Sequence, residues 1–371
     1  MKKLVFVGKF PEDSSKSVTG PANVLYNLVR SLSTLGKYDI IILDIFSLRK
    51  SLKSSETQKL DHNVTVIRTN CLGALSFLCK NNCQINYVNI HSPAPVYMIP
   101  FLVPNRKFEI MYTAHGLASR ELKLGAPYGW HFMLTERWVL KHSNVIFCVS
   151  NLIKKLIKLD YGAINNRIIV IPNGVPKDLG VRRISSKLFT DKYPKLKGTK
   201  FIIFAGGTRR LKGIRFLLKA FIEIEDDDLK LLIMGKKGDY YNDMHAEYST
   251  LIGTKIIDLG EVNHELLLSA FKNCLFVTHL SSLDSFGLVP LEAMALGIPV
   301  VVSNKVGMSD LIITGKNGFV VNYEDNLGLR SVIKKLVSSS DLRKKIGVES
   351  KNIITKYNWD SIAKEYAGHL R

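Results

Sequence analysis

The sequence predicts two doubly wound α/β domains, each built on a parallel sheet. Short runs of β-branched and other apolar residues recur along the chain, with helical segments between them. These runs are continuously apolar rather than alternating, which is typical of strands buried on both faces. The rhythm lapses between about Lys177 and Thr199 and then restarts. With 371 residues, 46% of them hydrophobic, the chain is long enough to bury two cores.

Seven strands are expected before the lapse and six after it. The first group covers residues 4–8, 40–46, 64–68, 85–91, 109–115, 145–150 and 168–172. The second group covers residues 201–207, 229–235, 255–260, 275–279, 299–303 and 318–322. We therefore expect an N-terminal domain over 1–178, a linker over 179–198 and a C-terminal domain over 199–356.

Positive charge is concentrated in the first half of the chain. The formal net charge is +20; residues 1–190 hold 26 Lys and Arg against 11 Asp and Glu, and residues 191–371 hold 26 against 21. Nucleic acid, an anionic membrane leaflet or a phosphorylated acceptor would each suit this charge. No recognised nucleic-acid-binding motif or aromatic-studded basic stripe accompanies it, so we expect no nucleic-acid partner.

Basic and aromatic residues occur together in one stretch of the first half. This mixture suits the surface of an anionic membrane, and a solvated basic surface is the alternative. The residues are Trp130, Phe132, Trp138, Lys141, Lys154, Lys155 and Lys158. No apolar run is long enough to span a bilayer, and the first residues lack a signal-peptide pattern. We expect a cytoplasmic protein, with docking on the inner membrane face as a hypothesis.

Candidate ligand-binding residues in the first domain follow its strands, because open parallel sheets bind ligands at the carboxyl ends of their strands. A polar loop after the first strand leads to Gly20 and Pro21 at a helix start, where backbone amides can hold phosphate oxygens. His115 ends the fifth strand, where it would bond a ligand hydroxyl, move a proton, or be satisfied by a backbone carbonyl. His91, which ends the preceding strand, is the competing candidate.

The first strand of the second domain leads into a glycine turn followed by three cations. They are Arg209, Arg210 and Lys212, directly before a helix. Fixed cations beside a helix start suit a leaving diphosphate, and a solvated basic loop is the alternative. The segment does not match GxxxxGK[ST], so a P-loop is disfavoured.

The segment from 275 to 312 is the most informative part of the sequence. After a strand, a small-residue loop carries Asp284, Phe286, Gly287 and Leu288. Gly287 lets the backbone approach a ligand closely, and a helix is expected to begin near Pro290 with Glu292 in its first turn. Glu292 can accept from a ribose diol or simply compensate the helix dipole, and Asp284 can accept from sugar hydroxyls.

These motifs resemble the retaining glycosyltransferases of family 4. The match lies in an acid, seven residues and a Glu within DSFGLVPLEAMALGIPVV, with a GG…KG turn, Asn173-Gly174-Val175 and Gly315-Lys316-Asn317-Gly318. The resemblance covers nearly the whole chain and implies the GT-B architecture, in which two Rossmann-like doubly wound domains face a cleft. Residues 357–371 resemble the final helix of the family, which packs back on the N-terminal domain.

The resemblance also implies how a nucleotide-sugar donor is bound. Glu292 would bind the ribose, and Lys212 with Arg209 or Arg210 would bind the diphosphate. The amides of residues 286–288 would hold the phosphate and the donor sugar. UDP is the default nucleotide and GDP the next. Many members carry the phosphate-binding Arg where this chain has glycine, so the sequence leaves the choice between the two arginines open.

For the transferred sugar, the resemblance implies contacts with His115 and Asp284. Asp284 stands where Glu is usual in the family, so its carboxylate is one methylene shorter. Retention of configuration would follow from front-face attack, in which the leaving phosphate helps take the acceptor proton. The acceptor would be a saccharide, lipid-linked if membrane docking holds, in the synthesis of a bacterial surface polysaccharide such as O-antigen, capsule or exopolysaccharide.

No metal or other cofactor is expected. The five cysteines are odd in number and lack CxxC spacing, so they are interpreted as buried free thiols. Asp226-Asp227-Asp228 resembles the metal-binding Asp-x-Asp motif of another glycosyltransferase fold. It falls between a helix and a strand start, which favours a solvated turn.

Two alternatives remain open at the level of sequence. A nucleotide-sugar epimerase of the same fold would share the nucleotide pocket, and it would not need an acceptor to act. A basic protein that binds nucleic acid or membrane without catalysis would fit the charge alone. A Rossmann dehydrogenase is disfavoured, because no GxGxxG follows a strand with an acidic residue about twenty positions on.

Overall fold

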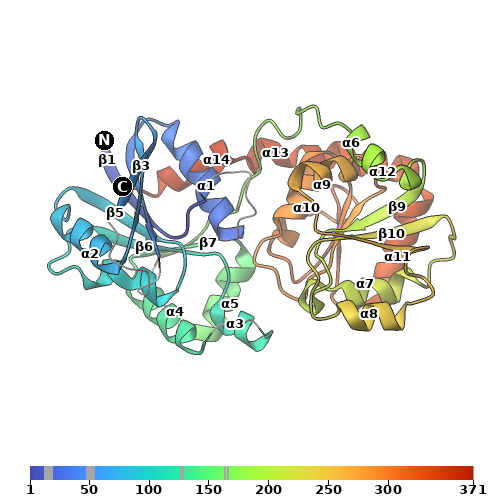
Figure 1. Ribbon diagram of the computed structural model, residues 1–371, viewed down its shortest axis with the longest axis horizontal. Helices are drawn as coiled ribbons and strands as arrows, with labels where there is room; N and C mark the ends of the chain where they lie inside the picture. Colours follow the sequence, from blue (N-terminus) through green and yellow to red (C-terminus); the bar gives the residue numbers. More distant parts are fainter. Residues whose placement is uncertain (12–19, 47–54, 126–128, 163, 165–166, 371) are drawn as a thin grey trace. The chain divides into compact units, whose positions relative to one another are not determined.

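The computed structural model describes residues 1–11, 20–46, 55–125, 129–162, 164 and 167–370. The chain forms two compact units (Figure 1). One contains Met1–Asn173 together with Trp359–Arg371, and the other contains Gly174–Asn358. None of the helices in these described ranges combines the length and apolarity needed to cross a membrane.

The first unit is built on an eight-stranded sheet. Its order is β3-β4-β2-β1-β5-β6-β7-β8, and all neighbouring strands run parallel except β3 and β4. The strands are β1 (Lys2–Val7), β2 (Tyr38–Ile45), β3 (Glu56–Asp61), β4 (Val64–Thr69), β5 (Ile85–Ile90), β6 (Glu109–Ala114), β7 (Val145–Cys148) and β8 (Arg167–Val170). The seven strands expected in this half are all present.

Strand β3 is an addition to the expected set. Its sequence ETQKLD is polar, and all six residues are exposed. It pairs antiparallel with β4 at the edge of the sheet. Continuous apolar runs indicate strands that are buried on both faces. An edge strand that buries neither face has no such run, so the sequence pattern did not predict β3.

The described part of the first unit contains seven helical segments. They are α1 (Gly20–Ser33), α2 (Cys71–Lys80), η1 (Pro95–Leu102), α3 (Ala118–Lys123), α4 (His131–His142), α5 (Asn151–Tyr161) and α14 (Trp359–Gly368). Helix α14 packs against α1, and the Ser31 hydroxyl donates to Asp360 at 3.0 Å. Tyr366 of α14 is buried, and its hydroxyl lies 2.6 Å from Asn89 Nδ2 at the end of β5. The final helix is thus part of the core of this unit.

The second unit is built on a six-stranded, fully parallel sheet. The strands are β9 (Lys200–Phe204), β10 (Leu229–Met234), β11 (Ile256–Gly260), β12 (Val277–His279), β13 (Val300–Ser303) and β14 (Phe319–Val321). Their order is β11-β10-β9-β12-β13-β14, so the direction of winding reverses between β9 and β12. This is the doubly wound order of dinucleotide-binding folds, whose ligands bind at that switch point. All six strands expected in this half are present.

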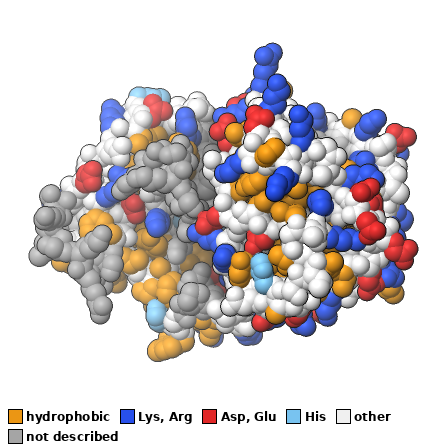
Figure 2. All heavy atoms as spheres, turned by 45° about the vertical axis from the view of Figure 1, so that its right-hand side comes forward, with side chains coloured by type: hydrophobic (Ala, Val, Ile, Leu, Met, Phe, Trp, Pro, Cys, Tyr) orange, Lys and Arg blue, Asp and Glu red, His pale blue; other side chains and the backbone are white. Residues whose placement is uncertain are grey.

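Helices cover both faces of the second sheet, with α9 and α10 on one side and α7 and α8 on the other (Figure 1). The helical segments are α6 (Lys187–Lys192), η2 (Pro194–Leu196), η3 (Arg210–Lys212), α7 (Ile214–Phe221), α8 (Tyr241–Glu247), α9 (His264–Phe271), α10 (Leu288–Ala295), η4 (Gly307–Leu311), α11 (Asn326–Ser338), α12 (Ser340–Lys351) and α13 (Ile353–Lys356). In the view of Figure 2, Lys and Arg side chains are interspersed with Asp and Glu over this unit.

Residues 179–198, expected to be a linker, belong to the second unit instead. This stretch contains helix α6, which packs against α9 of the second unit. Phe189 is fully buried, its ring centroid lies 5.5 Å from that of Phe201, and its amide donates to the Ser269 hydroxyl at 2.9 Å. The stretch is polar and α6 buries only Phe189, so the apolar pattern of the sequence did not indicate this short helix.

The triplet Asp226–Asp228 and two of the cysteines lie at the surface. Asp226–Asp228 precedes β10, at the opposite end from the carboxyl edge of the sheet, and the Asp228 amide donates to Asp226 Oδ1 at 3.1 Å. Among the described residues, no group of three or more His, Cys, Asp or Glu is placed to hold a metal ion. All five cysteines are free; however, Cys79 and Cys83 are exposed rather than buried.

Candidate functional site

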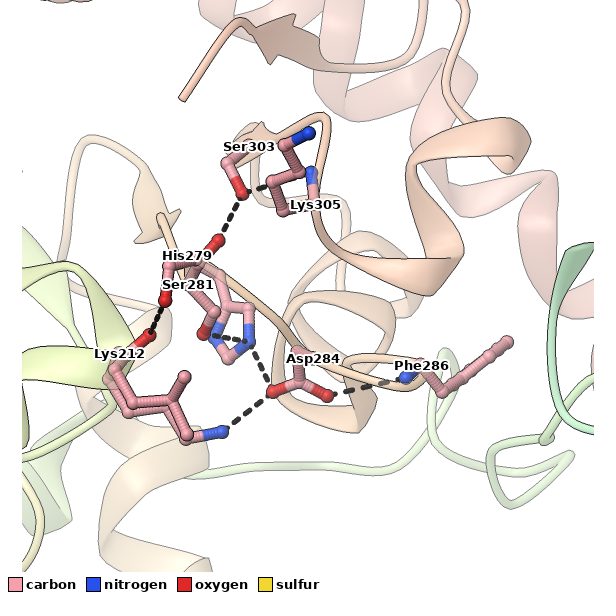
Figure 3. A network of polar contacts seen from close by, with 9 residues as sticks. Lys212, His279, Ser281, Asp284, Phe286, Ser303 and Lys305 are labelled. Atoms are coloured by element: carbon pink, nitrogen blue, oxygen red, sulfur yellow. Dashed lines mark hydrogen bonds and ion pairs between the residues drawn. The ribbon is translucent and has the colours of Figure 1, made fainter. Parts of the chain in front are cut away.

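The switch point of the second unit brings together a lysine and an aspartate that lie far apart in the sequence. Lys212 ends η3, which follows β9, and Asp284 lies in the loop after β12. Lys212 Nζ is 2.7 Å from Asp284 Oδ2, and His279 Nε2 is 2.9 Å from the same oxygen (Figure 3). A carboxylate at the carboxyl ends of two neighbouring strands thus holds a lysine ammonium in place.

Asp284 is itself fixed by several further hydrogen bonds. Its Oδ1 accepts from the Phe286 amide at 3.3 Å. Its backbone amide donates to the carbonyl of Lys305 at 3.0 Å, and its carbonyl accepts from Gly307 at 2.9 Å. Figure 3 also shows a hydrogen bond that supports the loop before Asp284: the Ser303 hydroxyl donates to the carbonyl of Ser281 at 2.5 Å. The loop therefore presents the carboxylate in one orientation.

The charge state of Asp284 follows from this environment. Burial by itself would raise its pKa, but the Lys212 ammonium and the His279 hydrogen bond outweigh burial, so the pKa lies well below its usual range. The carboxylate is ionised at neutral pH. A pair of opposite charges at 2.7 Å, with side chains only 27% and 15% exposed, is a preorganised polar site.

Two glycines make the close approaches that shape this site. Gly213 has φ +81°, and a Cβ there would lie 1.9 Å from the carbonyl oxygen of Leu280. Gly287 has φ +97°, and a Cβ there would lie 2.8 Å from Val306 Cγ1. A Cβ at Gly213 would force the backbone to shift, and one at Gly287 would displace the Val306 side chain and strain the left-handed backbone. The first contact sets the segment carrying Lys212 directly against the segment that follows β12.

Helix α10 begins at Leu288, two residues before the expected start. Glu292 is therefore the fifth helical residue and lies beyond the first turn, where compensation of the helix dipole weakens. Gly287 is the N-cap and offers no side-chain acceptor, so the first amides of α10 lack an intrahelical partner. The Phe286 amide, expected to hold a phosphate or sugar oxygen, donates to Asp284 Oδ1 instead, and the Phe286 side chain is buried.

Glu292 has a partner that the sequence analysis did not single out. His264 Nε2 lies 2.9 Å from Glu292 Oε1. His264 is the first residue of α9, whose N-cap Asn263 accepts from the Leu266 amide at 2.8 Å. The hydrogen bond to Glu292 raises the pKa of His264 despite partial burial. His264 and Glu292 lie on different helices, so their contact cannot be predicted from the sequence without the order of the strands.

The structure separates the two arginines that the sequence left equivalent. The Arg210 guanidinium is bonded to the carboxylate of Asp243 and lies 4.7 Å from the ring centroid of Tyr240. Its amide also donates to Asp239 Oδ1 at 2.8 Å. Arg209 is exposed, and its guanidinium has no hydrogen-bond or ion-pair partner among the described residues. Arg210 thus serves the contact with α8, and Arg209 remains available to a ligand.

In the first unit, His115 and His91 form a direct pair. They follow β6 and β5, and His91 Nδ1 lies 2.9 Å from His115 Nε2. Burial lowers the pKa of His115 to about 4, so its ring is neutral at physiological pH. The partner of His115 is a side chain rather than the backbone carbonyl considered from sequence.

Glu136 is a buried carboxylate that the sequence analysis missed. It lies on α4, and its two oxygens accept from the amides of Ala118 at 2.8 Å and Ser119 at 3.3 Å. The Tyr161 hydroxyl donates to the same carboxylate. Burial raises the pKa of Glu136, against these hydrogen bonds. Glu136 anchors the segment just after His115, and nothing in the sequence around it marks this role.

Gly20 is the first residue of α1, as the sequence predicted. A Cβ there would meet nothing within 4 Å. The polar loop before it, residues 12–19, lies outside the described residues.

The fold and the site together define a two-unit α/β protein whose second unit carries a fixed cation at a doubly wound switch point. Residues 186–353 match the family model described as "Glycosyl transferases group 1", and residues 18–179 match that described as "Glycosyltransferase Family 4". The chain belongs to the glycosyltransferases of family 4 and has the GT-B fold. It is therefore an enzyme of the glycosyltransferase class.

Curated relatives of the chain have the same class of activity in their names. The chain is 25% identical to an uncharacterized glycosyltransferase of Methanocaldococcus jannaschii, over 86% of this chain and 77% of that protein. It is 26% identical to the capsular polysaccharide biosynthesis glycosyltransferase CapM of Staphylococcus aureus, over 70% of each chain.

Solved structures share the fold at lower identity. Sucrose-phosphate synthase from Thermosynechococcus elongatus aligns with a TM-score of 0.76 at 16% identity, covering 99% of this chain and 98% of that one. Anabaena HepE in complex with UDP aligns with a TM-score of 0.76 at 17% identity, covering 100% and 99%. These likenesses concern the fold.

Proposed function

We propose that the enzyme transfers a sugar from a nucleoside diphosphate sugar to a saccharide acceptor with retention of anomeric configuration. The observation that carries the proposal is the pair of Lys212 and Asp284 at the switch point of the second unit. A fixed ammonium where open sheets bind their ligands suits the negative charge that develops on a leaving diphosphate. UDP is the preferred nucleotide, with GDP next; HepE, which shares the fold, was captured with UDP.

Each part of the second unit has a role in this proposal. Lys212 and Arg209 bind the diphosphate, and the amides of Gly287, the N-cap of α10, and of Leu288, its first residue, hold phosphate oxygens. Glu292 accepts from the ribose diol through Oε2, because His264 already occupies Oε1.

For the transferred sugar we propose two contacts. Asp284 orients Lys212 and accepts from a sugar hydroxyl, and His115 of the first unit bonds the same sugar. The leaving phosphate helps take the acceptor proton, so the reaction needs no dedicated protein base. Because Lys212 and the amides of α10 supply the positive charge, we expect no obligatory metal.

Proton NMR of a reaction mixture tests the proposed function directly. A panel of UDP- and GDP-hexoses would be incubated with saccharide acceptors, and free nucleotide and new anomeric signals followed together. We expect nucleotide release in step with a product whose anomeric configuration matches that of the donor. A changed sugar without any acceptor would support an epimerase instead, and an inverted product would refute retention.

The two arginines give the first specific prediction for the donor pocket. Replacing Arg209 with alanine should weaken nucleoside diphosphate binding about tenfold, the loss of one charge-assisted contact. Replacing Arg210 is the matched control and should change the affinity less than about twofold, because its guanidinium serves Asp243 and Tyr240. Calorimetric titration with UDP measures both, and equal losses would contradict the assignment.

The acceptor side of the proposal rests on the surface of α4. Trp130, directly before this helix, Leu134 and Trp138 are spaced four apart and are 71%, 56% and 52% exposed. Figure 2 shows hydrophobic side chains at the lower edge of the first unit, where Figure 1 places α4. Phe132, also predicted at this surface, is only half-buried rather than exposed.

Helices α4 and α5 also carry basic side chains. Lys141 on α4 and Lys155 and Lys158 on α5 are exposed, and Lys154 is half-buried. Aromatic anchors with flanking cations suit an anionic lipid surface. We propose docking there and a lipid-linked saccharide acceptor in surface polysaccharide synthesis. Relatives support this: one is named for capsular polysaccharide biosynthesis, and another is a phosphatidyl-myo-inositol mannosyltransferase of Mycobacterium leprae.

Tryptophan fluorescence tests the docking proposal. The chain has three tryptophans, and Trp359 is buried, so exposed-tryptophan emission reports Trp130 and Trp138. Vesicles containing anionic lipid should shift this emission to the blue, and high salt should reduce the shift. Replacement of both residues with serine should abolish it. Identical spectra with and without anionic lipid would contradict the proposal.

A further inference from the structure

The pair of His91 and His115 determines what His115 can offer to a ligand. A neutral imidazole has one N–H donor and one acceptor nitrogen, and the hydrogen bond made by one nitrogen fixes the state of the other. His115 Nε2 is engaged with His91 Nδ1 at 2.9 Å. His115 Nδ1 makes no hydrogen bond to the residues that the structure describes.

We propose that His91 is a positioning residue that donates its Nδ1 proton to His115 Nε2 and thereby fixes His115 as a hydrogen-bond donor through Nδ1. This inference rests on the proposed function only in placing His115 against the transferred sugar. It assigns His115 the role of donor to a sugar oxygen and excludes it as the base that takes the acceptor proton.

Both rings are neutral, so exactly one of them donates. Burial lowers the pKa of His91 well below its usual value, and the neighbouring His115 lowers it further. Burial has the same direction of effect on His115. With one proton on each ring, the contact has two arrangements: either His91 Nδ1 donates, or His115 Nε2 donates.

The far nitrogen of His91 distinguishes these arrangements. His91 is 4% exposed, and its Nε2 is buried without a hydrogen-bond partner. If His115 Nε2 donated, His91 Nε2 would have to carry a proton with no acceptor. If His91 Nδ1 donates, His91 Nε2 is only an unused lone pair. Buried N–H groups without acceptors are rarer in proteins than under-used acceptors, so the arrangement in which His91 Nδ1 donates is favoured.

The first strand and its neighbours hold His91 independently of His115. Its amide donates to the carbonyl of Val7 at 2.9 Å. Its ring stands edge-on to Phe6, with centroids 5.4 Å apart. A Cβ on Gly8 would come within 3.1 Å of His91 Cβ, so the backbone there is closely packed. His91 is thus a fixed donor to which the His115 ring adjusts.

Long-range proton–nitrogen NMR of the wild-type enzyme with labelled histidine reads the tautomer directly. We expect His115 to be protonated on Nδ1 and unprotonated on Nε2. The reverse assignment would overturn the inference while leaving glycosyl transfer intact. This measurement needs no variant, no donor and no acceptor.

Three variants of His91 connect the tautomer to the reaction. His91→Asn places an amide donor near the position of Nδ1, and it should keep the His115 tautomer with kcat within about threefold. His91→Asp offers only an acceptor, and His91→Leu offers neither. We expect both to shift the His115 nitrogen signals and to lower kcat about tenfold or more, with KM little changed. Unchanged signals and kcat in both would overturn the proposal.

His115→Ala separates this inference from the proposed function. A loss of kcat similar to that of His91→Asp supports a pathway through His115. If His115→Ala leaves kcat unchanged while the wild-type tautomer is as expected, the hydrogen-bonded pair stands but its role in the reaction is refuted.

Discussion

Replacing Lys212 with methionine is expected to lower kcat/KM about 100-fold or more and to destabilise the second unit. The first effect follows from the loss of the cation that opposes charge on the leaving diphosphate. The second follows because Asp284 would remain charged and largely buried without its partner, which costs about 2 kcal/mol or more. Steady-state kinetics and urea denaturation measure the two effects separately.

The stability effect should depend on pH in a defined direction. The folded-state pKa of Asp284 is depressed, so its contribution to stability is present above the unfolded pKa of about 3.9 and is lost as pH falls through the folded value. Methionine at 212 removes that contribution, and the gap between variant and wild type should narrow as the solution is acidified. A gap that is equal at pH 7 and pH 2 would contradict this account.

A double variant separates folding from function. Adding Asp284→Asn to Lys212→Met removes the buried charge and keeps a side chain that can bond His279 and the Phe286 amide. We expect much of the stability to return, because no unpaired charge is buried. The activity should stay low, since the cation is still absent. Recovery of activity in the double variant would refute the role of Lys212.

Alanine at Gly213 is expected to cost about 3 kcal/mol of unfolding free energy or more. The position combines a left-handed backbone, at φ +81°, with a Cβ site 1.9 Å from the carbonyl oxygen of Leu280. The segment carrying Lys212 would have to move away from the loop after β12. The same variant should therefore also weaken nucleotide binding.

Gly315 provides a matched control for Gly213. It has nearly the same φ, +80°, but a Cβ there meets nothing within 4 Å. Gly315→Ala should cost only the backbone strain, about 1 kcal/mol, and should leave nucleotide affinity unchanged. Urea denaturation of both variants isolates the steric contribution. Equal losses at the two sites would show that the approach to Leu280 is unimportant.

Sequence patterns predicted most of the fold, because its sheets are buried and parallel. All thirteen apolar runs became strands, since burial on both faces requires continuous apolarity. The pattern missed β3, which is polar and exposed, and α6, whose only deep anchor is Phe189. Both elements are too short or too solvated to carry a strong periodic signal.

Local motifs selected the residues of the proposed site, but they did not indicate which of these residues contact one another. Lys212 and Asp284 were each identified from local motifs, yet their ion pair spans 72 residues and depends on β9 lying beside β12. The difference between Arg209 and Arg210 depends on α8, and the partner of Glu292 depends on α9. Strand order and helix placement decide such contacts, and neither can be read from local sequence.

Binding of nucleoside diphosphates tests the central claim most directly. Thermal shift and calorimetry with UDP, GDP and ADP would be measured on wild type, on Lys212→Met with Asp284→Asn, and on Glu292→Gln. The account predicts that one nucleotide stabilises the wild type, and that both variants lose most of this stabilisation although they remain folded. If no nucleotide stabilises the wild type, or if the variants respond as strongly as the wild type, the proposed donor pocket is contradicted.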